Sequence, residues 1–123
     1  MSTLGRTNNE DGAAAVEMAL VLPILLLLVF GIIEFGFVFN RYISVTHAAR
    51  EGARQMAIRP TDELTDAVAA AEASAPDLAG NITCSGTYPA GDVEMTCSAT
   101  YSLNLFVINE DMTLTSTAKM RKE

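Results

Sequence analysis

Residues 18–39 read MALVLPILLLLVFGIIEFGFVF, and this apolar stretch decides the fold. Its only ionisable side chain is Glu34. As a helix it would be about 33 Å long at about 1.5 Å per residue, which is enough to cross a hydrocarbon core of about 30 Å. The rest of a 123-residue chain is too short to bury a helix that is apolar on all sides. We therefore expect a membrane-spanning helix rather than a buried core helix.

A cleaved secretory signal is the next alternative for this stretch. Such a signal has a short apolar region followed by small residues at the cleavage site. Here the apolar run is longer and ends in the bulky sequence FGFVF, residues 35–39. We expect the segment to stay on the mature protein.

Two signals disagree about the orientation of this helix. Only Arg6 precedes the apolar run, whereas Arg41, Arg50, Arg54 and Arg59 follow it. By the positive-inside rule this asymmetry places the C-terminal part in the cytoplasm. The chain also has an even pair of cysteines, which in a small domain favours an oxidising, extracytoplasmic compartment.

Two helices are predicted after the membrane segment. Residues 44–58 carry small and apolar side chains at helical spacing, and Pro60 ends this helix, which we expect to continue the membrane helix. The small-residue stripe packs either on the protein's own sheet or on neighbouring subunits. A second helix is predicted at about 62–74, with Thr61 as its N-terminal cap.

From residue 81 the apolar period changes to two, which predicts three strands at about 81–88, 93–105 and 112–119. The fold class is therefore α+β, with a three-stranded antiparallel meander that buries one face. A two-residue turn at Ala90-Gly91 pairs residues whose numbers sum to 181, and Cys84 and Cys97 satisfy this. They form either a cross-strand disulfide, worth about 3 kcal/mol in the chain-entropy model, or a pair of reduced core cysteines.

No catalytic constellation, cofactor motif or basic nucleic-acid patch is present in a chain of net charge −7. Two cysteines and the lone His47 are too few for a zinc site. We expect no enzyme, no metal, no cofactor and no nucleic-acid partner.

Two blocks in the first 57 residues resemble a known family. The first is Gly12, then Glu17 five positions later, then the apolar run; the second is THAAREGARQMA, residues 46–57. Together they resemble TadE-like proteins, which are pseudopilins of tight-adherence (Flp, type IVb) pilus systems.

The resemblance implies processing by prepilin peptidase between Gly12 and Ala13. Residues 1–12 would be a leader, 13–39 a transmembrane helix and 40–123 an extracytoplasmic α+β domain. The protein would cross the bacterial cytoplasmic membrane once, with its N-terminus in the cytoplasm. Its partners would be the bilayer, the peptidase, other pilin or pseudopilin subunits and the inner-membrane platform, and its length fits a minor pilin.

Glu17 would become residue five of the mature chain and could pair with the new amine of a neighbouring subunit, since an unpaired buried charge is costly. Met18 stands where the family motif often has an aromatic residue. Pro23 removes one helix hydrogen bond and can kink the helix. Glu34 either reaches the outer interface or makes a second inter-subunit contact. The rival function is an uncleaved, signal-anchored extracytoplasmic domain that binds a ligand or envelope partner.

Overall fold

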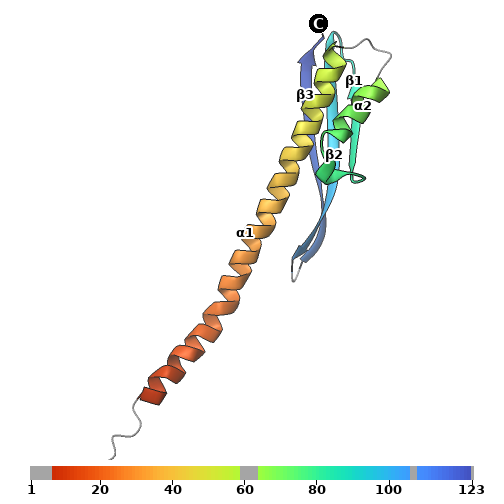
Figure 1. Ribbon diagram of the computed structural model, residues 1–123. Coiled ribbons are helices and arrows are strands. Elements are labelled where there is room, and N and C mark those ends of the chain that lie inside the picture. The colour runs from red at the N-terminus through yellow and green to blue at the C-terminus, as the bar shows by residue number, and fades with distance from the viewer. Residues whose placement is uncertain (1–6, 59–63, 106–107, 123) are drawn as a thin grey trace, which may run out of the picture. The chain divides into compact units, whose positions relative to one another are not determined.

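The structure is a computed structural model that describes residues 7–58, 64–105 and 108–122. It confirms the predicted α+β class (Figure 1). The elements along the chain are α1 (Thr7–Ile58), α2 (Leu64–Ala73), the short 3₁₀ helix η2 (Pro76–Leu78), β1 (Ile82–Thr87), β2 (Asp92–Leu105) and β3 (Ile108–Arg121). The chain divides into two compact units, Met1–Phe35 and Gly36–Glu123, which are described in turn.

The N-terminal unit contains the first part of α1, and its apolar side chains are exposed. Leu20 has 70% and Phe35 has 73% of its surface accessible, and the neighbouring leucines and isoleucines are similar. Among the described residues, α1 is the one helix that is long and apolar enough to cross a membrane. α1 begins at Thr7, so Thr7 to Gly12 are already helical, whereas the sequence analysis began the helix at Ala13.

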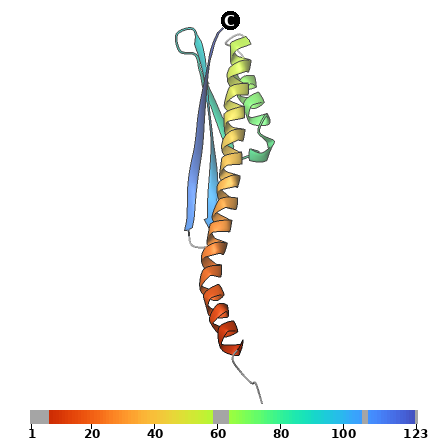
Figure 2. The ribbon, with the colours of Figure 1, turned by 90° about the vertical axis from the view of Figure 1, so that its left-hand side faces the viewer.

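The C-terminal unit has two layers, with both helices on one face of the sheet (Figure 2). Its part of α1 buries a stripe of small and apolar side chains against the sheet: Val45, Ala48, Ala49, Ala53 and Met56. The spacing follows the helical period, which is why the stripe could be seen in the sequence. Of the two alternatives for this stripe, packing on the protein's own sheet is therefore the one observed.

Gly52 lies in the same stripe, at a position where α1 closely approaches β2 and α2. A Cβ atom built on Gly52 would lie 2.7 Å from Cε of Met95 on β2 and 2.9 Å from Cβ of Ala71 on α2. Carbon atoms pack at about 3.5–4.0 Å, so no side chain fits at this position. Glycine thus sets the distance between α1 and the two elements beside it.

The second helix is close to the prediction and covers the β1 side of the sheet. α2 buries Ala67 and Ala71, and η2 adds the buried Leu78. The first two residues of the predicted helix, 62 and 63, lie outside the described residues. Oε1 of Glu72 accepts a hydrogen bond from the backbone N–H of Cys84 at 3.1 Å, so α2 also contacts the outer edge of β1.

The sheet has the strand order β1-β2-β3, and both pairings are antiparallel. Ala90 and Gly91 have φ angles of 30° and 93°, and the N–H of Asp92 donates to the carbonyl of Pro89 at 2.7 Å. This is the two-residue turn expected from the sequence, and the β1–β2 register follows from it. β1 and β2 agree with prediction to within one residue at each end.

The third strand was predicted too short. β3 starts at Ile108, which pairs with Leu105, rather than at residue 112. Asn109, Glu110 and Asp111 are all polar, so this part of the strand lacks the alternation by which a strand is recognised in sequence. Backbone pairing with β2 holds these residues in the sheet without a buried face.

Candidate functional site

The predicted processing site lies on the exposed surface of α1. No heavy atom lies within 4 Å of a Cβ built on Gly12, and both Gly12 and Ala13 are exposed. An approaching protein would therefore meet no obstruction from the described residues at this bond. The bond is helical, and residues near a helix terminus open at little free-energy cost.

Glu17 and Met18 lie about one turn further along the helix. Together with Ala14 and Val21 they line a shallow surface hollow of about 250 Å³, and both side chains are exposed. Residues four apart share one helix face, so Glu17 lies on the same face as Ala13. The structure therefore puts the carboxylate and the peptide bond after Gly12 on one accessible side of the helix.

The other two predicted features of the membrane helix are separate from this pair. Pro23 lies inside α1 and does not end it. Glu34 is half-buried, near the end of the N-terminal unit. The structure does not bring Glu34 together with Glu17, because the two positions are many turns apart on one helix.

The two cysteines form a disulfide in the C-terminal unit. Cys84 and Cys97 are joined with Cα atoms 4.1 Å apart, and they are paired neighbours on β1 and β2. Both are buried on the face that packs against the helices. The predicted cross-strand disulfide is confirmed, and the reduced pair is not what the structure contains.

A charged cluster lies on the polar face of α1, and the hydrogen bonds within it were not predicted from the sequence. Glu51 accepts hydrogen bonds from Nε of Arg54 at 3.0 Å and from Nε2 of Gln55 at 2.8 Å. These bonds, led by that from Arg54, lower the pKa of the Glu51 carboxyl to about 2. The i, i+3 and i, i+4 spacing of these residues was the signal available in the sequence.

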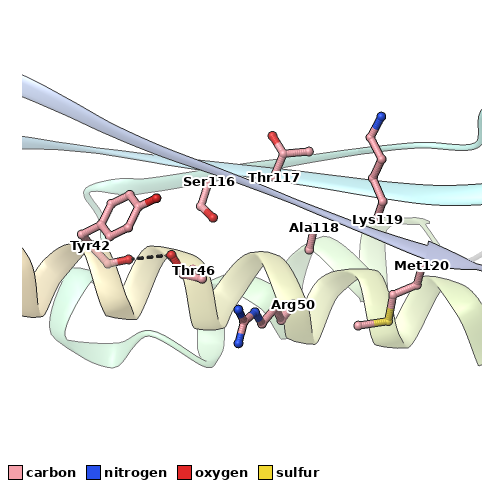
Figure 3. A pocket seen from close by; sticks show the side chains of 8 residues that line it. All are labelled: Tyr42, Thr46, Arg50, Ser116, Thr117, Ala118, Lys119 and Met120. Atoms are coloured by element: carbon pink, nitrogen blue, oxygen red, sulfur yellow. Dashed lines mark hydrogen bonds between the residues drawn. The ribbon is translucent and has the colours of Figure 1, made fainter.

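Two further contacts were not foreseen because they join distant parts of the chain. Cζ of Arg41 lies 4.7 Å from the ring centre of Tyr101 on β2. A groove of about 410 Å³ runs between α1 and β3, with Tyr42, Thr46 and Arg50 on the helix side and residues 116–120 on the strand side (Figure 3). Neither the groove nor any other described part of the chain gathers three or more metal-ligating side chains.

The comparisons with known proteins relate only part of the chain to a family. The model of the family described as TadE-like protein matches residues 12–54. The match begins at Gly12, includes Glu17 and the apolar run, and ends in the buried stripe of α1. No curated protein and no solved structure matches the chain.

Proposed function

The chain is TadE-like over residues 12–54, and from this premise we propose that it is a membrane-anchored, pseudopilin-like subunit of a tight-adherence pilus apparatus. Its role is assembly rather than catalysis: it helps to initiate or support a filament as a minor component. The observation that carries the proposal is that the family match starts at Gly12 and leads into a helix whose apolar surface is exposed.

An exposed apolar helix is stable only in an apolar environment. Burying apolar surface is worth about 25 cal/mol per Å², so a helix with leucine and phenylalanine side chains open to water on all faces is unfavourable in solution. A bilayer or the apolar helices of other subunits remove this cost. The single candidate span near the N-terminus fits a single-pass membrane protein.

Two contacts support an extracytoplasmic C-terminal domain. The Cys84–Cys97 disulfide belongs to an oxidising compartment. Two of the arginines that argued for the opposite orientation make contacts with other residues of the C-terminal unit. Arg41 stacks on Tyr101, and Arg54 pairs with Glu51 on the surface at 2.9 Å. Their engagement weakens the arginine count as evidence for a cytoplasmic domain.

Glu17 gives the proposal its mechanism. A charged side chain at the centre of a bilayer costs roughly 2.5–3.5 kcal/mol on insertion scales, but Glu17 is placed before the first residue of the long apolar run and can reach the interface. Prepilin peptidase cleavage after Gly12 would create an ammonium group on Ala13. Inside a bundle of helices, Glu17 of one subunit would pair with this amine on its neighbour and so fix the register between subunits.

A matched pair of variants tests this mechanism. Glu17→Ala should leave membrane insertion intact and impair assembly or processing. Glu34→Ala removes the other carboxylate of the same apolar helix and should leave membrane insertion and processing intact, because Glu34 lies many turns from Gly12. The readouts are carbonate-resistant membrane association, the size of the processed chain and the yield of pili. Wild-type processing and wild-type pili with Glu17→Ala would contradict the pairing of Glu17 with the new amine.

A further inference from the structure

The two edge strands of the sheet differ in how well their outward backbone groups are protected from pairing with an added strand. The β1 edge spans only six residues, and Glu72 of α2 accepts the outward N–H of Cys84 there. The β3 edge spans 14 residues, and within the described chain no strand pairs with its outer side. Open edges are templates for an added strand, and natural proteins blunt them with bulges, prolines or charges.

The centre of β3 has none of these protective features. Its register with β2 is unbroken over all 14 pairs, so it contains no bulge. Residues 113–117 read TLTST, without a charge or a proline and with threonines that favour strands. Charges lie only towards the ends, with Glu110 and Asp111 at one end and Lys119 and Arg121 at the other; Lys119 pairs with Glu94 of β2.

The direction of the free backbone groups can be assigned. The N–H of Lys122, just after β3, donates at 3.2 Å to the carbonyl of Gly91, just before β2. Because N–H groups alternate in an antiparallel ladder, the even-numbered residues of β3 bond to β2 and the odd-numbered ones point outward. Thr113, Thr115 and Thr117 therefore present free N–H and C=O groups along the open edge.

The groove between α1 and β3 follows this edge and would receive the side chains of an added strand (Figure 3). On its helix side it offers Tyr42, Thr46 and Arg50. Arg50 is exposed, and no described carboxylate lies within ion-pair distance of it. A strand lying here could place an acidic side chain against Arg50 and uncharged side chains beside Thr46.

A second copy of this chain is a poor occupant of the edge. α1 and β3 run in the same direction along the groove, from Tyr42 to Arg50 and from Ser116 to Met120 (Figure 3). Copies anchored in one membrane share their polarity, so their β3 strands would pair in parallel and bring Glu110 beside Glu110 and Arg121 beside Arg121. Such like-charge neighbours are destabilising. This exclusion rests on the proposed membrane anchoring.

We propose that the β3 edge is a docking site for a strand of a different protein chain in the apparatus. The strand is uncharged at its centre and acidic at the end that reaches Arg50. Main-chain hydrogen bonds to the odd-numbered threonines provide affinity, and the groove selects the side chains, as in other cases of strand addition.

Proline substitution separates docking from folding. Thr115→Pro removes an outward N–H and blocks an added strand, whereas Ser116→Pro removes an N–H that bonds to β2. We expect the thermal midpoint of Thr115→Pro to stay within a few degrees of the parent. Ser116→Pro should unfold at a clearly lower temperature. Thr115→Val retains the N–H and serves as the matched control.

The test uses the full chain in cells that make the complete apparatus, with a photo-crosslinking residue at Thr113. The expected result is an adduct with another subunit, mapped by mass spectrometry to an extended segment of the predicted charge pattern. Thr115→Pro should reduce this adduct at least tenfold, and Thr115→Val less than twofold. The proposal would be overturned if the adduct forms with a second copy or with lipid alone, or if a probe at Thr83 on β1 gives as much adduct as the probe at Thr113. It would also be overturned if Thr115→Pro does not reduce the adduct, or if no adduct forms. Carbonate extraction of the same cells tests membrane anchoring separately. Failure of the proposed membrane-anchored function can therefore be told apart from failure of the docking proposal.

Discussion

Replacing Gly52 by alanine should destabilise the C-terminal unit, although alanine is the better helix former. In an exposed helix interior this change gains about 0.5–1 kcal/mol. Here the new methyl group would meet Met95 Cγ at 2.8 Å, Met95 Cε at 2.7 Å and Ala71 Cβ at 2.9 Å. Met95 is fully buried and has little room to turn, and Ala71 can move only with the backbone of α2.

The clash should outweigh the gain in helix propensity. Inserting a methyl group into a packed core costs about 1–3 kcal/mol, and this site lies at the upper end because two neighbours are crowded at once. The net loss is roughly 1–2 kcal/mol. For a domain of this size, each kcal/mol lowers the thermal midpoint by about 4–8 °C, so the midpoint should fall by roughly 5–15 °C.

Gly36→Ala is the matched control on the same helix. A Cβ at Gly36 meets no heavy atom within 4 Å, so this variant should be as stable as the parent or slightly more stable. The assay is thermal unfolding of the full chain in detergent, followed by far-ultraviolet circular dichroism with the disulfide intact. A Gly52→Ala protein at least as stable as Gly36→Ala would refute the close approach of α1 to β2 and α2.

Two further predictions concern the disulfide and the charged cluster. Cys84 and Cys97 are 13 positions apart, and reducing their disulfide should lower the free energy of unfolding by about 3 kcal/mol. Thiol labelling should find no free thiol before reduction and two after it. An unchanged thermal midpoint on reduction would contradict the chain-entropy argument. Because the pKa of Glu51 is lowered to about 2 from a usual 4.5, its contribution to stability is complete above about pH 4.5 and is lost as the pH falls towards 2. Arg54→Gln should move this pKa upward in an NMR titration of the Glu51 carboxyl, and an unmoved value would show that Arg54 is not the cause.

The features that follow from a local period could be predicted from the sequence. The apolar helix, the small-residue stripe of α1 and the β1–β2 register each depend on spacing along one or two adjacent segments. The disulfide followed from the register because a two-residue turn fixes which residues face each other. The predicted roles of Gly12, Glu17 and Glu34 depend on partners outside this chain, so they stay predictions.

The features that were missed depend on contacts between distant segments. The early part of β3 lies in the sheet because Ile108 pairs with Leu105, and its polar sequence gives no sign of this. Gly52 was recognised as a member of a small-residue stripe, but the stripe alone could not show that Met95 and Ala71 crowd it. The groove beside β3 exists only because the helix and the strand edge fold side by side.

The most direct test of the account is the mass of the mature chain. Full-length protein should be expressed in a host with an active prepilin peptidase, extracted from the membrane and measured intact, with a host lacking the peptidase as control. The account predicts a chain that starts at Ala13 in the first host and the full-length chain in the second. A full-length mass in both hosts would contradict it and would identify the protein as an uncleaved membrane anchor.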